Sequence, residues 1–446
     1  MTAKQLPSRP TARPWASRPH PCCSERGAAM LATMALMVVV LLVGVALFTL
    51  GTAESELVDY TGDGREAFWL AEAGLERARA WLAEMYASDP GYDPVGTEVA
   101  GQPLGEGDYT FRVIAGGGGA APAYVVESDG VVDGVLRRVR ATFTAESLAR
   151  YQWLIDSQAP DTWMKTGDNF EGPVHMNGHL RIDGDPWFGA KVTASGDYIE
   201  KPDSDPTFTQ EYETGVPEVA FPNLSAVEAS LRAAAISDGL YGPALSGSDY
   251  YEVEMGRTGA GMLSYRINGS ATTNWVDVDI TSLEGAAWFD SEVRVKGVID
   301  GELTIGCSED LYISGDILFY GSTPGSGPDP GCNDLFGIIG AENVYVADTP
   351  DNSSDCEIHG VIMALDRRFQ VEDWNKAPSR GTLTIWGGII ADQAWRINTF
   401  VGSTLRSGYL RDFHYDGRMT SIFPPFFPMT GRFLMTSWQE VMPPEV

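Results

Sequence analysis

The chain has 446 residues, and its 50 glycines and 27 prolines make up about 17 % of it, against roughly 12 % in average proteins. This share favours a loop-rich, mostly β body, and a hydrophobic content of 43 % is ample for two or three packed domains. The formal charge is −30, from 31 basic and 61 acidic residues, which argues against binding to nucleic acid or to anionic lipid. Twelve tryptophans exclude a disordered chain.

The N-terminus combines a basic leader with a long apolar segment. Residues 1–27 hold one acid and the basic residues Lys4, Arg9, Arg13, Arg18 and Arg26. Residues 28–53 carry no charge, and as a helix they would measure about 39 Å, enough to cross a bilayer core of about 30 Å. Basic residues before this span and acidic residues after it predict a cytoplasmic N-terminus. We therefore expect a protein with one membrane crossing, whose chain after residue 53 lies outside the cytoplasm.

Three kinds of segment have an apolar span of this kind. A cleaved secretory signal has a shorter apolar core and a small-x-small cleavage site, which is not the pattern here. A plain signal-anchor fits the length. A pilin-type leader, in which a basic segment ends in Gly and the apolar helix begins at the next residue, fits Gly27 and Ala28.

Two segments, ERGAAMLA at 25–32 and AFWLAEAGLE at 67–76, resemble the N-terminal domain of PilX-type minor pilins of type IV pilus assembly. The resemblance implies cleavage by prepilin peptidase after Gly27 and methylation of Ala28. It also implies partners: the inner membrane, other pilin subunits and the pilus assembly machinery. Pilins usually carry Glu at the fifth mature position, which here is Ala32. The apolar helix would enter a filament core through residues such as Met30, Leu31, Leu36, Leu41, Leu42 and Phe48.

Residues 54–147 predict a helix followed by an antiparallel sheet, which is the pilin plan. An apolar stripe with 3-4-3-4-3 spacing runs from Phe68 to Met85, and Gly62 and Gly64 predict an interruption of the helix near residues 60–64. Alternating residues within 109–113, 123–126 and 135–144 predict the strands.

Residues 148–446 form a second, larger unit of very short apolar runs separated by Gly or Asp-Gly. Strands of three or four residues that turn every six to ten residues favour an irregular β-helix, a solenoid, over a sandwich. No strict repeat is visible, so a distorted sandwich stays as the alternative. We expect the aromatic and proline-rich C-terminus, including 424–428, to lie across the open end of this domain and cap its core.

The cysteines fit an exported protein. Cys22 and Cys23 would be lost on cleavage of the leader, which leaves Cys307, Cys332 and Cys356. In an oxidising compartment one pair is expected to join, and the Cys307–Cys332 pair is the candidate.

No motif points to catalysis. His175 and His179 are separated by a turn signal and lack the Glu of a zinc-protease helix, and neither a Gly-x-Ser-x-Gly elbow nor a phosphate loop occurs. We expect no enzyme, no catalytic residue, no metal site and no cofactor. If an ion binds, Ca²⁺ is the candidate, held by the carboxylates of residues 183–185 or 59–64. The second segment resembles the start of an EF-hand loop but has Leu70 where that loop needs Glu.

The sequence thus predicts a structural minor pilin-like subunit, present at low copy or at a filament tip, whose large β domain serves adhesion or scaffolding. The alternative is an uncleaved single-pass envelope protein whose β domain binds glycan or Ca²⁺.

Overall fold

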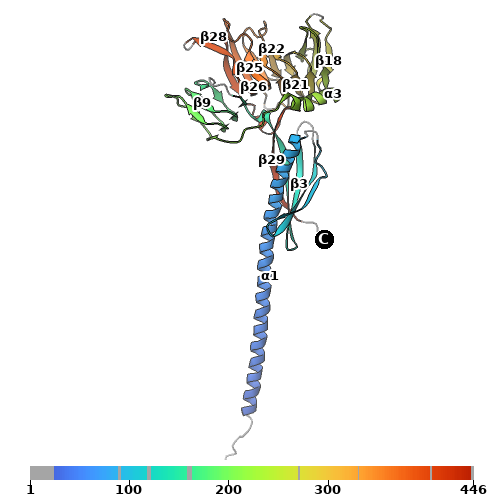
Figure 1. Ribbon diagram of the computed structural model, residues 1–446, viewed down its shortest axis with the longest axis vertical. Coiled ribbons are helices and arrows are strands. Elements are labelled where there is room, and N and C mark those ends of the chain that lie inside the picture. Colours follow the sequence, from blue (N-terminus) through green and yellow to red (C-terminus); the bar gives the residue numbers. More distant parts are fainter. Residues whose placement is uncertain are drawn as a thin grey trace, which may run out of the picture.

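The computed structural model of the protein describes residues 25–88, 92–117, 122–157, 163–269, 272–329, 331–401 and 404–442. Most of the predicted leader, including Cys22 and Cys23, lies outside these residues. The chain is mostly β with one long N-terminal apolar helix, as expected (Figure 1). A large domain lies across one end of that helix, and a small sheet packs along the helix next to it.

The helix α1 (Glu25–Ser88) has 64 residues and therefore spans about 96 Å. It continues without a break through Gly62 and Gly64, so the predicted interruption at 60–64 is wrong. Each glycine costs about 1 kcal/mol in a helix interior, but helix-forming residues on both sides keep the hydrogen-bond ladder intact.

A five-stranded antiparallel sheet packs on the second half of α1, in the order β1-β2-β3-β4-β29. The predicted strands lie within β2, β3 and β4, whereas β1 and β29 were not predicted. The bounds are β1 (Glu98–Leu104), β2 (Gly107–Gly117), β3 (Ala123–Val132), β4 (Val135–Ser147) and β29 (Met429–Val441).

The contact between the helix and the sheet is close because small residues lie on both sides of it. A Cβ on Gly130 of β3 would lie 2.0 Å from the Ala67 carbonyl oxygen, and a Cβ on Gly74 would lie 2.1 Å from the Ser128 hydroxyl. Around these points the predicted helix stripe and alternate strand residues form one apolar core. Its buried members are Ala71, Leu75, Ala78, Leu82, Phe111, Val113, Tyr124, Val126, Val139, Ala141, Phe143, Ala145 and Phe433.

The last strand corrects the expected role of the C-terminus. Residues 429–441 do not cap the large domain; they return to the small sheet and pair antiparallel with β4. The preceding aromatic run does pack on the large domain, where Phe427 is buried. The large domain is therefore an insertion between β4 and β29, and the small sheet contains both ends of that insertion.

The first part of the large domain, which we call the N-terminal stack, is built from parallel strands in register. Val174 pairs with Val192, 18 residues later, and Val192 pairs with Tyr212, 20 residues later. Three parallel rows result. They are β5 (Trp153–Ile155), β8 (Val174–Met176), β11 (Val192–Ala194) and β14 (Tyr212–Thr214); β7 (Asn169–Phe170), β10 (Trp187–Phe188) and β13 (Thr207–Phe208); and β6 (Met164–Lys165), β9 (Leu180–Asp183) and β12 (Tyr198–Glu200).

The second part, the C-terminal stack, also consists largely of parallel strands. Its main row runs β15-β19-β21-β23-β25-β26. These strands are β15 (Leu240–Gly242), β19 (Ala286–Phe289), β21 (Glu302–Cys307), β23 (Leu335–Gly340), β25 (Cys356–Val371) and β26 (Ser379–Arg396). Flanking strands are β16 (Tyr250–Met255), β17 (Met262–Asn268), β18 (Val276–Asp279), β20 (Val293–Ile299), β22 (Leu311–Phe319), β24 (Val344–Val346), β27 (Asn398–Val401) and β28 (Thr404–His414).

The two stacks are joined by strands from opposite ends of the large domain's sequence. Residues 389–391 of β26, the last strand of the main row, pair with 153–155 of β5, the first strand of the domain. The segment that links the stacks contains the short helices α2 (Leu224–Val227) and α3 (Ala233–Ser237), and α3 contacts β15 and β19. The chain therefore enters and leaves the large domain next to the small sheet. The large domain extends to both sides of α1 and its sheet, which together we call the stalk (Figure 1).

Stacked aromatic rings support the N-terminal stack. The rings of Phe170 and Phe188 are parallel with centroids 5.3 Å apart, and those of Phe188 and Phe208 are 4.9 Å apart. Replacing the fully buried Phe188 by Ala is expected to lower the free energy of unfolding by about 3–5 kcal/mol, because it removes the middle ring and leaves a cavity. Guanidinium unfolding of the full chain in detergent, followed by circular dichroism, measures this.

Trp187→Ala on the same strand is the control, since Trp187 is 38 % exposed and should cost far less. Equal losses for the two variants would contradict a packing role for the ring stack.

Candidate functional site

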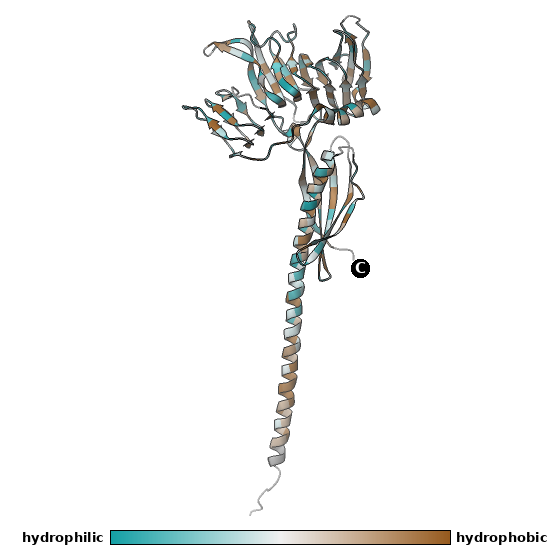
Figure 2. Ribbon diagram, in the orientation of Figure 1, coloured by the Kyte–Doolittle hydropathy of each residue, from teal (hydrophilic) through white to brown (hydrophobic). Residues whose placement is uncertain are grey.

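The first half of α1 is an unpartnered apolar surface. Within the described residues, α1 is the one helix long and apolar enough to cross a membrane. Figure 2 shows the hydrophobic colour concentrated in this half, away from the sheet. The predicted filament residues Met30, Leu31, Leu36, Leu41, Leu42 and Phe48 are each 60–73 % exposed. Because burying apolar surface is worth about 25 cal/mol per Å², lipid or other protein must cover this segment.

The predicted processing site lies at the start of this helix. Gly27 and Ala28 belong to the first turn of α1, so the backbone is already helical where the leader would be cut. Acidic residues first appear beyond the apolar run, at Glu54. The apolar surface therefore extends without a charge from the predicted cleavage point to residue 53.

A groove of about 940 Å³ lies where α1 meets the lower end of the small sheet. Tyr60 and Phe68 of the helix line one side, and Val135 and Met442 line the other. Tyr60 and the nearby Trp69 are both 63 % exposed. Exposed apolar residues thus continue along the helix past the charged residues at 54–59.

The returning strand β29 clamps the helix to the sheet. The Trp438 indole N–H donates to the Glu72 carboxylate at 2.7 Å, and its ring meets Phe68 edge-on at 6.3 Å. Toward the end of β29, Glu440 pairs with Arg137 of the neighbouring strand β4 at 2.6 Å. The clamp therefore connects three segments, from the two ends of the chain and from β4.

The large domain is attached to the stalk through a neck of two chain segments, 146–150 and 428–430. The Leu148 N–H donates to the Pro428 carbonyl at 2.9 Å, and the Thr430 hydroxyl donates to the Glu146 carboxylate at 2.9 Å. Glu146 also pairs with Arg150. Because the two segments are hydrogen-bonded to each other, the large domain is held at two points and does not rotate about a single connecting strand.

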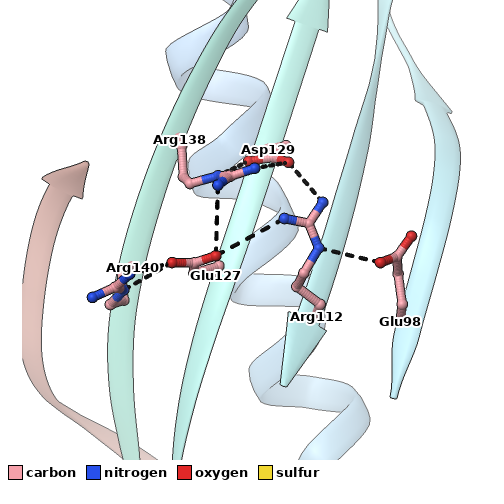
Figure 3. A network of polar contacts seen from close by, with 6 residues as sticks. All are labelled: Glu98, Arg112, Glu127, Asp129, Arg138 and Arg140. Atoms are coloured by element: carbon pink, nitrogen blue, oxygen red, sulfur yellow. Dashed lines mark hydrogen bonds and ion pairs between the residues drawn. The ribbon is translucent and has the colours of Figure 1, made fainter. Parts of the chain in front are cut away.

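An ionic network covers the face of the small sheet that points away from α1 (Figure 3). Arg112 of β2 contacts Asp129 of β3 at 2.8 Å and Glu98 of β1 at 3.2 Å. Arg138 of β4 forms two hydrogen bonds with Asp129, and Arg140 pairs with Glu127. The network therefore links four adjacent strands of the sheet.

Asp129 is the centre of this network. Burial alone would raise the pKa of its carboxyl, but hydrogen bonds from Arg138 and Arg112 outweigh burial and hold the pKa below its ordinary value. The carboxylate is thus charged and paired on both sides.

The cysteines do not form the predicted bond. Cys307, Cys332 and Cys356 are free thiols in the described chain, so the predicted Cys307–Cys332 pair is absent. Burial raises the pKa of Cys307 to about 12, and its thiol donates to the Glu309 carbonyl at 3.3 Å. The Cys332 thiol instead donates to Asp334 at 3.3 Å. Even spacing in sequence did not place these side chains together, because the strands and loops around them differ in length.

The histidines have separate hydrogen-bond partners. His175 is buried between Thr193 and Asn177, at 2.7 Å from each, and burial lowers its pKa. His179 accepts from the Asp197 backbone N–H at 2.9 Å. Both side chains thus stabilise turns between stacked strands.

Neither Ca²⁺ candidate forms a loop of converging carboxylates. Residues 59–64 are helical, which excludes an EF-hand-like loop there. Asp183 pairs with Lys201 at 2.8 Å, and this hydrogen bond lowers the pKa of Asp183. Among the described residues, no group of three or more His, Cys, Asp or Glu side chains is placed to hold a metal ion.

Comparisons with known proteins cover parts of this architecture. The family model for a domain of unknown function, DUF4900, matches residues 109–196, from β2 through the neck to the end of β11. Among solved structures, the chain is similar to the competence-associated pilin ComZ from Thermus thermophilus, at 13 % identity and a TM-score of 0.34, covering 85 % of this chain and 97 % of that one. A likeness at that TM-score carries no argument about function. No curated protein matches the chain.

Truncating the buried Phe433 side chain should weaken the packing of β29 on α1 and the small sheet. Phe433 is 2 % exposed and contacts the rings of Tyr86 and Tyr124, with centroids at 6.1 and 6.0 Å. Phe433→Ala is expected to destabilise the small sheet by about 3–5 kcal/mol, which limited proteolysis in detergent would detect as faster cleavage near residue 429. The control is Met435→Ala on the same strand, since Met435 is 38 % exposed and this variant should be cleaved at the rate of the wild type. If Met435→Ala is also cleaved faster, Phe433 has no special role in holding β29.

The ionic network makes the stability of the sheet depend on pH. Asp129→Asn is expected to cost about 2 kcal/mol at neutral pH, because two guanidinium groups lose a charged acceptor. Asp129 has a lowered pKa, so its contribution is complete above the ordinary aspartate pKa of about 3.9 and disappears as the pH falls through the folded value. Thermal unfolding at pH 7 and pH 3 should show the difference between wild type and variant shrinking at pH 3.

The exposed Asp108 of β2 provides the control, since Asp108→Asn should change little at either pH. A gap between wild type and Asp129→Asn that is equal at both pH values would contradict a paired carboxylate.

Proposed function

We propose that this protein is a structural, minor pilin-like subunit of a type IV pilus or a related pseudopilus. The observation that carries the proposal is the division of α1, whose first half is apolar and exposed while its second half packs on an antiparallel sheet. The first half holds the subunit in the inner membrane and later enters the core of a filament. The sheet is then the part that packs against neighbouring subunits.

The size and placement of the large domain support a low-copy or tip position. It is inserted between β4 and β29 and extends to both sides of the stalk (Figure 1). A domain that extends to both sides would collide with its copies in a closely packed shaft, whereas at a tip it is free. We regard its two stacks as an irregular β-helix, since parallel in-register pairing is what successive rungs produce. The step between paired residues is 18 and 20 residues in the N-terminal stack and varies from rung to rung in the C-terminal stack.

The role of this subunit is mechanical rather than chemical. The two-segment neck and the β29 clamp suit a domain that bears load, because both connections to the stalk are hydrogen-bonded to each other. Its partners are the membrane, other pilin subunits, the assembly machinery and prepilin peptidase. Adhesion or scaffolding by the large domain is part of the proposal.

The test is mass spectrometry of the N-terminal peptide of the protein from its native host. The expected result is a peptide that begins at methylated Ala28. Gly27→Val should abolish that peptide, because the leader would no longer end in Gly, whereas Glu25→Gln should leave it. An intact peptide that contains Cys22, Cys23 and Gly27 in the wild type would overturn the proposal, in favour of an uncleaved single-pass envelope protein.

A further inference from the structure

A basic groove lies on the large domain where its two stacks meet. It has a volume of about 620 Å³, and we call it the seam groove. Its walls come from segments that are at least 200 residues apart in the chain. The lining is Trp163, Lys165, Asp168, Arg368, Trp374, Gln393, Ala394, Arg396, Ile397, Asn398, Thr399, Phe400 and Arg411.

The groove exists because only one row of strands crosses the seam. The row that contains β5 continues into β26, but β6 and β7 are edge strands of their own three-stranded rows. Beside them, side-chain bonds replace the missing ladder: Arg411 of β28 pairs with Asp168, and His414 contacts Glu171 at 3.1 Å. These side-chain contacts hold the two walls of the groove together, although no backbone hydrogen bonds of a sheet are formed between them in the described chain.

The charge of the seam groove is opposite to that of the protein. Four cationic side chains line it against a single carboxylate, in a chain whose net charge is −30. That carboxylate, Asp168, is already engaged, since it pairs with Arg411 and accepts from the Lys165 backbone N–H at 2.7 Å. The Lys165 ammonium lies 3.9 Å from Asp183, which already pairs with Lys201 at 2.8 Å. Lys165 is 61 % exposed, and Arg396 is exposed, so both cations can reach a ligand. The groove thus presents an excess of positive charge.

The remaining lining is aromatic and amide in character. The Arg396 guanidinium lies over the Trp374 ring, 5.6 Å from its centroid, and the Lys201 ammonium lies over the Trp163 ring, 4.5 Å from its centroid. Gln393 and Asn398 add amide groups, and Thr399 adds a hydroxyl. Aromatic rings with cations, amides and hydroxyls around them suit sugar rings that carry hydroxyl and carboxylate groups.

A second groove of about 600 Å³ continues the first, because the two share Arg368, Gln393 and Arg396. It adds Asn343, Tyr345, Arg367 and Gln370, together with the acids Glu342 and Asp366. The combined surface runs from the seam onto the C-terminal stack. Its shape therefore suits an extended chain.

We propose that the seam groove binds an acidic polysaccharide, with uronate carboxylates on Lys165 and Arg396 and sugar rings beside Trp163 and Trp374. A single-stranded nucleic acid also combines anionic groups with rings, so it is the competing ligand in the test below. In a uronate chain each sugar carries a carboxylate and several hydroxyl groups, which match the cations, amides and hydroxyl of the lining. The assignment rests on the proposed function in one respect, that the large domain lies outside the membrane.

The experiment is calorimetric titration of the full-length protein, in non-ionic detergent and without calcium, with an oligogalacturonate. The expected result is binding that weakens as salt is added, since the contacts are charged and partly exposed. A neutral maltooligosaccharide of equal length should bind weakly or not at all. Lys165→Gln and Arg396→Gln should each weaken oligogalacturonate binding about fivefold.

The matched control is Arg257→Gln. Arg257 also stacks on a tryptophan, with its guanidinium 4.6 Å from the Trp275 ring, but it follows β16 and does not line the seam groove. Its replacement should leave binding unchanged.

Three results would overturn the proposal: no binding of oligogalacturonate, equal weakening by Arg257→Gln, or tighter binding of a single-stranded oligonucleotide at the same salt. The titration uses unassembled protein, so it succeeds or fails independently of whether the leader is cleaved at Gly27.

Discussion

The antiparallel pairing of β29 with β4 is the interaction on which the rest of the structure depends. It returns the chain to the small sheet after the whole large domain, and it places Phe433 in the helix–sheet core and Trp438 against Glu72. Without it, β4 would be an exposed edge strand and the large domain would hang from one connection. With it, the exposed apolar half of α1 is continuous with a rigid body, and the large domain is held by two hydrogen-bonded segments at the neck. The apolar half of α1 and the large domain are thereby connected through one hydrogen-bonded body.

A second constraint is the order in which the stacks join. Because β26 pairs with β5, the free ends of the two stacks point away from the stalk and the seam falls at the centre. Only the row through β5 is continuous there, so the neighbouring edges of β6 and β7 leave a groove. The pairing that joins the two stacks is therefore also the feature that leaves the basic seam groove between them.

Charge has different uses in the two parts of the molecule. On the small sheet, arginines and carboxylates alternate across four strands and neutralise one another around Asp129. At the seam groove, cations outnumber carboxylates although the chain is strongly acidic. Net charge describes solubility and long-range repulsion, but it does not describe a local site. The net charge of −30 therefore does not describe the local excess of cations at the seam groove.

The sequence by itself determined the features that depend on neighbouring residues. Charge-free length predicts the apolar helix, a 3-4 spacing predicts the stripe from Phe68 to Met85, and alternation predicts β2, β3 and β4, because each of these signals repeats within one turn or one strand. Of the stripe, the structure buries Ala71, Leu75, Ala78 and Leu82 in the core. Only the tertiary structure decided the pairings across long stretches of chain: β29 on β4, β26 on β5, the three free thiols, and the meeting of Trp163 with Trp374 at the seam groove. The aromatic and β-branched residues Phe433, Thr436, Trp438 and Val441 could have suggested a strand, but not its partner. A strand's partner is chosen by the packing of the whole domain, and no local periodicity records which of many compatible edges will be free.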